Sequence, residues 1–279
     1  MQILLKNERE DKTLKKKIYI SWLVSMAICL VFSCLFSARA IAAGKDDALH
    51  WYLKNNDTHD QPSIDPAQSR IEKYNGYYVD KRCGKTSEDK VLYLTFDAGY
   101  ENGNVAKILD VLKEEQVPAA FFVLKNIVLK QEVLLKRMVK EGHTVCNHTM
   151  SHRDTTKMNE TEFKQELLGL AELYKDVIGE EMPCYYRPPE GCYNEKTLQW
   201  ASDMGYKTVF WSFAYVDWDN ERQPDPEKAK EKIKKHTHNG AVILLHPTSE
   251  TNAKILSDVI RDWKAQGYRF GTLDELCGQ

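Results

Sequence analysis

Carboxylate, imidazole and guanidinium side chains follow several short apolar runs of this sequence. The run Val91–Phe96 ends on Asp97, and Gly99 comes two residues later. A buried strand that stops on an aspartate places one charged group at the rim of a sheet, and the glycine lets the chain turn sharply there. Asp97 is therefore either a helix cap or a catalytic carboxylate. Its position alone favours the cap, but the polar clusters downstream favour catalysis.

Two imidazoles lie four residues apart in His148-Thr149-Met150-Ser151-His152. On a helical turn they would share one face, as metal-binding pairs do; the alternative is two polar surface histidines. Thr149 stands where a zincin motif has its glutamate base, so a base must come from elsewhere, and Asp97 is the candidate. A metal held by two histidines and facing a carboxylate can activate water for attack on a carbonyl.

Three further groups allow acid–base chemistry. His246 follows the apolar run 242–245 and can protonate a leaving amine, or it is a buried histidine at a strand end. Asp217 can orient His246 and favour its protonated form, or it caps a loop. Arg187 can hold Asp97 in place and keep it ionised, or it is only an ion-pair partner.

Two neighbours of these groups suggest a substrate site. Trp218 offers a flat apolar wall for a sugar or an acyl methyl group, with a core aromatic as the alternative. Pro188 and Pro189 stiffen the loop after Arg187, so that its backbone N–H groups could face a developing oxyanion.

The elements that must position these groups form a repeating pattern. Apolar residues at helical spacing alternate with short apolar runs, and helices are predicted to end at Gly142, Gly205, Gly240 and Gly267, each before a strand. Such βα units predict an α/β fold with a parallel sheet, open or closed into a barrel. The active site of such folds lies at the carboxyl ends of the strands, where all these groups are expected. The charge-dense run 225–235 is expected to be a solvated helix.

Charge is unevenly distributed along the 279 residues, which suffice for one large domain or two small ones. The formal net charge is −2, of which residues 1–43 contribute +4 and the remainder −6. A mildly acidic body argues against nucleic acid as the main partner.

The basic head precedes an apolar stretch. Lys15–Lys17 lead into Ile18–Phe36, which contains no charged residue, and small residues spaced as A-x-A follow in Ser37–Ala43. Residues 1–43 are therefore a secretory signal peptide or, because the apolar run could span a bilayer, an uncleaved membrane anchor. Both alternatives send the rest of the chain out of the cytoplasm, secreted or anchored by residues 18–36.

Residues 44–88 are polar and rich in turn formers, and their scattered aromatics predict a lead segment that packs along the following domain. Five cysteines lie outside the apolar run, and no CxxC pair is present, so a structural zinc knuckle is not supported. Free and mostly buried thiols are favoured over a Cys184–Cys192 disulfide.

Five motifs in this order resemble the polysaccharide deacetylases with the NodB homology domain, which form carbohydrate esterase family 4. The motifs T-F-D-x-G, H-T-x-x-H, R-P-P-x-G, D-W and L-x-H stand at Thr95–Gly99, His148–His152, Arg187–Gly191, Asp217-Trp218 and Leu244–His246. They cover about residues 89–271 and leave 272–279 as a tail. The stretch Thr95–Gly103 and the aromatics Trp51-Tyr52 are most similar to the delta-lactam-biosynthetic de-N-acetylase branch, which acts on peptidoglycan N-acetylmuramic acid.

The resemblance implies a distorted (β/α) barrel and metal-dependent removal of N-acetyl groups from a peptidoglycan glycan strand, particularly from N-acetylmuramic acid destined to become muramic delta-lactam in spore cortex. It implies a monomer and a divalent cation, with zinc favoured. Carried over by motif, Asp97 is the base, His148 and His152 bind the metal, Arg187 positions Asp97, and His246, tuned by Asp217, is the acid. Trp218, Glu190 and Tyr100 are the expected substrate-binding residues.

Two positions depart from the family pattern. Ala98 stands where most members have an aspartate that binds the metal, so that position supplies no third ligand, and Glu190 replaces the usual tyrosine. Two alternative functions follow. One is a deacetylase for N-acetylglucosamine or chitin-type units; the other is a non-catalytic glycan-binding pseudoenzyme, which Ala98 favours. Intact Asp97, Arg187 and His246 argue against the pseudoenzyme, because binding alone needs no acid–base pair.

Overall fold

A computed structural model describes residues 47–54 and 57–278. All helices and strands below belong to the compact unit Ala48–Gln279. None of the helices in the described ranges is long and apolar enough to cross a membrane. The apolar run expected to be a signal or anchor lies outside these ranges.

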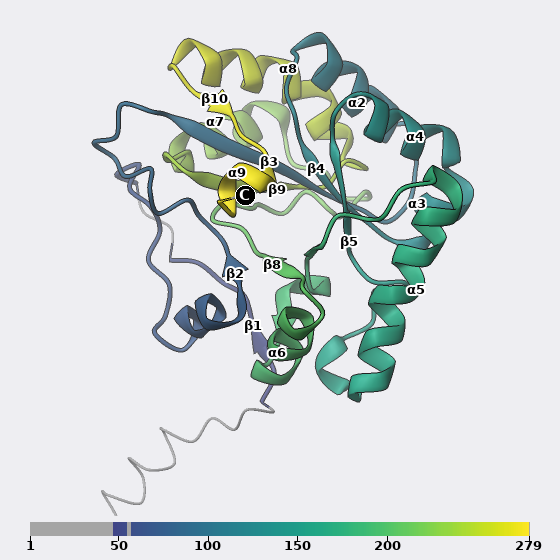
Figure 1. Ribbon diagram of the computed structural model, residues 1–279. Coiled ribbons are helices and arrows are strands. Elements are labelled where there is room, and N and C mark those ends of the chain that lie inside the picture. Colours follow the sequence, from purple (N-terminus) through teal and green to yellow (C-terminus); the bar gives the residue numbers. More distant parts are fainter. Residues whose placement is uncertain (1–46, 55–56, 279) are drawn as a thin grey trace, which may run out of the picture. The chain divides into compact units, whose positions relative to one another are not determined.

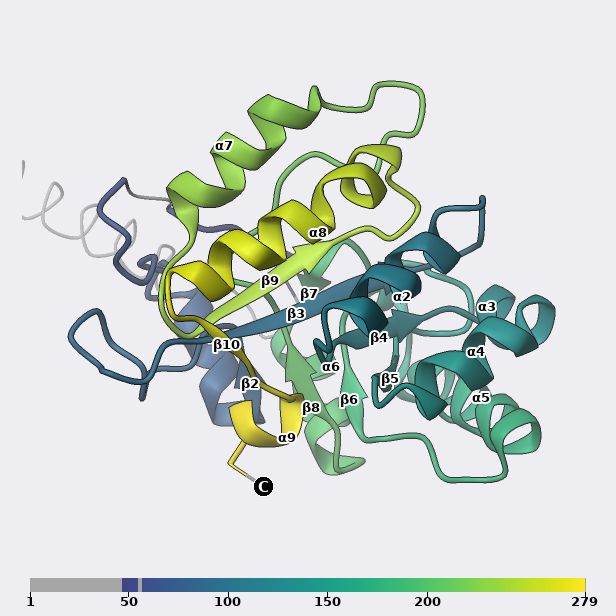
Figure 2. The ribbon, with the colours of Figure 1, turned by 90° about the horizontal axis from the view of Figure 1, so that it is seen from above.

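A curled parallel sheet forms the centre of this unit (Figures 1 and 2). Every pair of named strands in it is parallel, β9 pairs with β3 beside the main path, and Val79 adds one isolated antiparallel bridge to Ala241 of β9. The strand order is β10 (Arg269–Phe270), β3 (Val91–Ala98), β4 (Ala120–Val123), β5 (Thr144–Asn147), β6 (Tyr185–Tyr186), β8 (Lys207–Val209) and β2 (Gly76–Tyr77), with β9 spanning Ala241–Leu245. The predicted α/β fold with a parallel sheet is confirmed.

The sheet is a half-barrel rather than a barrel closed by a continuous ladder. Beyond β8, the chain meets β9 in one isolated parallel bridge between Phe213 and Ile243. β5 and β6 share only the pair Asn147 and Tyr186. Helices cover the outside of the curled sheet (Figure 1).

Each long helix buries one apolar stripe, as its sequence spacing predicts. In α2, Val105, Ile108, Leu109 and Leu112 are buried. α7 buries only Ala229 and Ile233, so its charged residues form the solvated face that was expected. The helices are α2 (Val105–Glu114), α3 (Lys125–Lys130), α4 (Glu132–Lys140), α5 (Glu160–Ile178), α6 (Glu195–Asp203), α7 (Pro226–His236), α8 (Glu250–Ala265) and α9 (Leu273–Leu276), with 3-10 turns η1 (Gln68–Tyr74), η2 (Thr155–Lys157) and η3 (Pro189–Gly191).

Three of the four predicted glycine junctions are helix ends. Gly142, Gly205 and Gly267 follow α4, α6 and α8 with φ of 84°, 81° and 86°. The prediction for Gly240 is wrong, because α7 already ends at His236. A side chain at Gly240 would place its Cβ 2.5 Å from the Asp80 carbonyl oxygen, so close backbone approach requires this glycine.

The segment before β3 adds one strand to the curled sheet and pairs another strand with the chain that follows β6. β1 (Leu49–His50) pairs antiparallel with β7 (Cys192–Tyr193), and β2 pairs with β8. Trp51 stacks on Phe210 with ring centroids 4.5 Å apart. The five cysteines of the described residues are free, so Cys184 and Cys192 form no disulfide.

Candidate active site

Polar side chains meet at the carboxyl end of the curled sheet. Asp97 is the penultimate residue of β3, His148 directly follows β5, Arg187 follows β6 and His246 follows β9. Because these strands are parallel, their ends lie at one edge. Asp217, on the segment after β8, bonds to His246 there. The structure thus brings together the acid–base residues that the strand-end pattern predicted.

Asp97 is held by a fully buried arginine. Arg187 Nη1 donates to Asp97 Oδ1 at 2.8 Å. Burial acts to raise the pKa of Asp97, but the charge of Arg187, with smaller contributions from His148 and His246, outweighs it and holds the pKa below its usual range. Asp97 is therefore an ionised carboxylate at neutral pH.

The remaining donors of Arg187 are also bonded. Its Nε atom donates to the Val209 carbonyl at 2.9 Å, and Nη2 donates to Thr95 Oγ1 at 3.0 Å and to the Phe210 carbonyl at 3.2 Å. Thr95 Oγ1 in turn donates to the Ile243 carbonyl at 2.7 Å. The motif T-F-D-x-G contains Thr95 but assigns it no function. Its position two residues before Asp97, on the same face of the strand, is the sequence feature that indicates a place beside the carboxylate.

His148 is oriented by the same arginine. His148 Nδ1 donates to the Arg187 carbonyl at 2.8 Å, which leaves Nε2 facing Asp97 Oδ2 at 3.6 Å. Burial lowers the pKa of His148 to about 4, so the ring is neutral and Nε2 carries a lone pair at neutral pH. A histidine whose other ring nitrogen is bonded to a carbonyl is typical of metal ligands.

The two histidines of the pair are neighbours, but not on a helical turn as predicted. Residues 148–152 form a loop in which Thr149 and His152 have φ of 74° and 57°. Asn147 Oδ1 accepts from Thr149 N at 2.9 Å, and Thr149 Oγ1 accepts from His152 N at 3.0 Å. These side-chain bonds replace the helical ones and bring the rings of His148 and His152 to a centroid distance of 5.0 Å.

A buried glutamate from α5 supports this loop and was missed in the sequence. Glu166 accepts from Ser151 N at 2.9 Å and from Ser151 Oγ at 2.6 Å. Its only sequence signal was a charged residue within the apolar stripe of a predicted helix, next to Leu167.

The histidine pair fits a divalent cation by donor chemistry, because two imidazoles lie side by side and the Nδ1 atom of His148 is bonded to the Arg187 carbonyl. The described residues contain no group of three or more His, Cys, Asp or Glu side chains placed to hold a metal. Ala98 ends β3 with a buried methyl group and supplies no ligand atom. The site therefore offers a two-histidine set.

His246 is clamped by Asp217 through both its ring and its backbone. His246 Nδ1 donates to Asp217 Oδ1 at 2.7 Å, and His246 N donates to Asp217 Oδ2 at 2.8 Å. Burial acts to lower the pKa of His246, but the bond and charge of Asp217, together with the charge of Asp97, raise it above its usual value. The clamp directs the free Nε2 atom away from Asp217.

The three expected substrate-binding residues are exposed at this edge. Trp218 is 55% exposed, and its ring lies edge-on to His246 at 5.9 Å between centroids. Tyr100 is 48% exposed, and its hydroxyl bonds to the Asn220 side chain, which links the loops after β3 and β8. Glu190 is exposed, with φ of 55°, in the loop after Arg187.

The stiff proline loop does not offer all of its backbone donors. Gly191 N donates to the Pro188 carbonyl at 3.0 Å, and Cys192 N donates to the Pro189 carbonyl. The expectation that N–H groups of this loop face an oxyanion is therefore wrong for these two residues, because both are bonded inside the loop.

Comparison with known proteins places these residues in a family context. A family model described as polysaccharide deacetylase matches residues 84–209. The peptidoglycan-N-acetylmuramic acid deacetylase PdaA of Bacillus subtilis is 38% identical over 258 residues, which are 92% of this chain and 96% of PdaA. A solved structure of B. subtilis PdaA, described as a family 4 carbohydrate esterase, aligns with a TM-score of 0.77 and 39% identity over 83% of this chain and 97% of that one. A peptidoglycan-N-acetylglucosamine deacetylase of Bacillus cereus is 30% identical over 68% of this chain and 89% of its own length.

Proposed function

This chain belongs to the polysaccharide deacetylase family, and we propose that it removes N-acetyl groups from the amino sugars of peptidoglycan. The observation that carries the proposal is that two held groups meet at one edge of the sheet: Arg187 holds one oxygen of the Asp97 carboxylate at 2.8 Å, and Asp217 holds Nδ1 of His246 at 2.7 Å. Against burial, the charge of Arg187 lowers the pKa of Asp97, and the bond and charge of Asp217 raise the pKa of His246. A base and an acid with pKa values pushed apart at one site are what amide hydrolysis needs.

N-acetylmuramic acid is the proposed sugar, and its product would be destined for muramic delta-lactam in spore cortex. The support is the similarity to PdaA along almost the whole of both chains, whereas the N-acetylglucosamine deacetylase matches a shorter part of this chain. The glycan strand of peptidoglycan is then the partner, and a monomer suffices for the site. We also propose that the protein works outside the cytoplasm, because the sequence of residues 1–43 resembles a signal peptide or anchor.

Asp97 acts as the general base in this mechanism. Water attacks the acetyl carbonyl carbon while its proton passes to the Asp97 carboxylate. Arg187 keeps that carboxylate ionised by its charge and fixes it by the bond from Nη1 to Oδ1. Among the described residues, no hydrogen bond reaches Oδ2, whose contact is His148 Nε2 at 3.6 Å. A hydrolysis base needs one such free oxygen.

His246 acts as the general acid. As the carbon–nitrogen bond breaks, protonated His246 gives its Nε2 proton to the departing nitrogen, and the products are acetate and the free amine of the sugar. Asp217 holds the opposite ring nitrogen, so the proton that leaves is the one on the site's side. Asp97 then returns its proton to solvent and His246 regains one.

His148 and His152 would hold a divalent cation, for which we propose zinc. Such a cation supplies Lewis-acid polarisation of a carbonyl oxygen. The exposed ring of Trp218 offers an apolar surface for the sugar or the acetyl methyl group, and Tyr100 and Glu190 offer polar contacts from the adjoining loops.

Acetate release from defined glycans tests the proposal. Purified residues 44–279 with zinc are given peptidoglycan strands carrying acetyl groups on muramic acid only, on glucosamine only, or on both. We expect acetate from every strand acetylated on muramic acid, and none from the glucosamine-only strand. If only the glucosamine-acetylated strand released acetate, N-acetylglucosamine would be the substrate instead of N-acetylmuramic acid. If neither these strands nor chitin oligosaccharides released acetate, the result would support a pseudoenzyme.

A further inference from the structure

Asn252 lies behind the acid of the proposed reaction, and no motif of the sequence drew attention to it. It is the third residue of α8 and is 1% exposed. A buried amide is costly unless its donors and acceptor are bonded. Both the Nδ2 donor and the Oδ1 acceptor of Asn252 are bonded, so the partners define the orientation of the amide.

The bonds of Asn252 run to Asp217, His246 and Tyr215. Its Nδ2 atom donates to Asp217 Oδ2 at 2.6 Å and to the His246 carbonyl at 3.1 Å. Its Oδ1 atom bonds to the Tyr215 hydroxyl. Two of these partners accept hydrogen bonds: the His246 carbonyl has no proton to give, and Asp217 Oδ2 already accepts from His246 N. The amide therefore has one allowed orientation, with Nδ2 toward Asp217 and Oδ1 accepting from Tyr215.

Tyr215 keeps that orientation at every working pH. It is 5% exposed, and burial, with the charge of Asp217, raises the pKa of its phenol well above the usual value. The hydroxyl thus stays protonated and donates to Asn252. The chain of bonds from Tyr215 through Asn252 to Asp217 has a fixed direction.

We propose that Asn252 is a positioning residue for the reaction, which acts on His246 through Asp217 and is itself held in register by Tyr215. Asp217 is 1% exposed, so bulk water does not reach its carboxylate. Without Asn252, Oδ2 keeps only His246 N. The carboxylate that fixes the imidazole then has freedom to rotate, and the carbonyl of residue 246 loses its bond as well. This proposal rests on the function proposed above, but its structural part can be tested without substrate.

Capping of α8 does not depend on this side chain. Ser249 Oγ accepts from the backbone N of Asn252, which any residue at that position provides. A matched control exists in the same turn. Thr251 is 3% exposed, and its Oγ1 donates to the Pro224 carbonyl at 2.7 Å without touching Asp217 or His246. Thr251→Val removes a side-chain hydrogen bond to a carbonyl from the same turn.

The first test is a double-mutant cycle on acetate release. Asn252→Ala should lower kcat roughly ten- to hundredfold and leave KM within about threefold, because a misplaced acid affects the reaction more than binding. In the Asp217→Asn background the same substitution should change kcat by less than about twofold, since the residue acts through Asp217. The proposal would be overturned if the kcat losses of the two single variants multiplied in the double variant, or if Thr251→Val lost as much kcat as Asn252→Ala.

The second test needs no activity and therefore separates this proposal from the proposed function. With ¹⁵N-labelled histidine, the Nδ1 proton of His246 should be protected from exchange in the parent and in Thr251→Val, and should exchange at least about tenfold faster in Asn252→Ala. Tyr215→Phe, which keeps the amide but frees its orientation, should lie between them and covers the case that Asn252→Ala does not fold. Equal protection in all folded variants would refute the positioning role, even if the protein released no acetate.

Discussion

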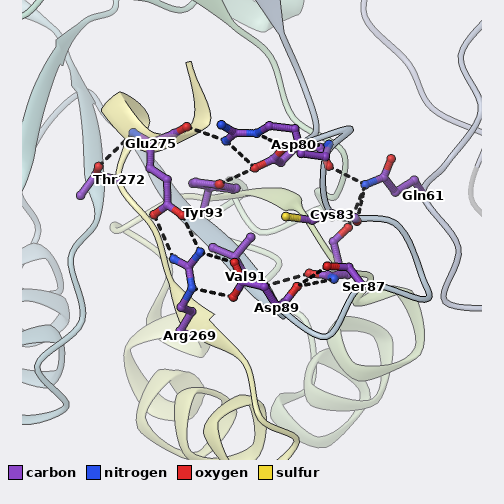
Figure 3. A network of polar contacts seen from close by, with 12 residues as sticks. Gln61, Asp80, Cys83, Ser87, Asp89, Val91, Tyr93, Arg269, Thr272 and Glu275 are labelled. Carbon is purple, nitrogen blue, oxygen red and sulfur yellow. Dashed lines mark hydrogen bonds and ion pairs between the residues drawn. The ribbon is translucent and has the colours of Figure 1, made fainter. Parts of the chain in front are cut away.

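Both ends of the curled sheet carry an aspartate bound by an arginine, but the two carboxylates differ in how fully they are bonded. At the amino ends, Asp80 accepts from Arg82 N, Nε and Nη2 and from the Tyr93 hydroxyl, at 2.6–2.9 Å (Figure 3). At the carboxyl ends, and among the residues that the structure describes, Asp97 accepts one hydrogen bond, from Arg187, and its Oδ2 atom has only the 3.6 Å contact with His148.

The same contrast continues around each aspartate. Beside Asp80, the Nε2 atom of Gln61 donates to three backbone carbonyls, and Arg269 donates to both Asp89 and Glu275 (Figure 3). A carboxylate with four donors has no lone pair left for a substrate, so the amino-end network can only hold loops together. Asp97 is rigid on one oxygen and free on the other, which is the condition for taking a proton.

Asp97→Asn should give the largest effect of any single substitution. Asparagine can still accept from Arg187 but cannot take a proton, so deacetylation should fall by at least three orders of magnitude, while the fold remains. Acetate release and circular dichroism on the same sample measure both. A variant within about tenfold of the parent would exclude Asp97 as the base.

Metal removal or His148→Ala should come next. Excess chelator should remove nearly all activity of the parent, and added zinc should restore it, because paired imidazoles are ligands that zinc prefers. Chelator should not change the activity left in His148→Ala. A parent enzyme that keeps full activity in excess chelator would contradict the assignment of the histidine pair.

Much of the site followed from sequence because strand ends are visible as apolar runs that stop on a polar residue, as at Asp97 and His246. The conformation of residues 148–152 did not follow. It depends on the Asn147 side chain and on Glu166 from a distant helix, neither of which has a local signature. The role of Asn252 could not be predicted, because a polar residue in the first turn of a helix is expected to face solvent. Gly240 was wrongly predicted to end a helix, because a glycine between a helix and a strand resembles a helix cap.

Asp80→Asn should affect stability and leave catalysis alone. Its loss weakens bonds to a buried phenol and to Arg82, so the free energy of unfolding should fall by about 1–3 kcal/mol in urea titrations. The kcat/KM of the folded fraction should stay within about twofold of the parent. A tenfold loss of kcat/KM without unfolding would show that the amino-end network is coupled to the reaction.

His143 offers a pH-dependent effect on stability, without an effect on the reaction, at the amino end of β5, the strand that His148 follows. Burial lowers the pKa of His143 to about 4 in the folded protein, and Ala119 N donates to its Nδ1 atom. Between about pH 6.5 and pH 4 the unfolded chain binds a proton that the folded chain does not, so this group makes stability fall as pH falls through that window. The loss should approach roughly 3 kcal/mol near pH 4. His143→Asn, which keeps an acceptor near Nδ1, should show a shallower decline of unfolding free energy from pH 7 to pH 5; an unchanged slope would exclude His143 as its source.

The pH dependence of kcat/KM tests the central claim most directly, because it reports the free-enzyme base and acid together. The parent should give a bell-shaped profile, with an acidic limb from Asp97 below the usual carboxyl range and a basic limb from His246 above the usual imidazole range. Asp217→Asn should move the basic limb to lower pH and leave the acidic limb in place, since only the imidazolium loses a stabilising charge. His246→Ala should remove the basic limb and lower the rate by roughly two to four orders of magnitude. A basic limb that survives in His246→Ala would show that another residue is the acid and would contradict the pairing of Asp97 with His246.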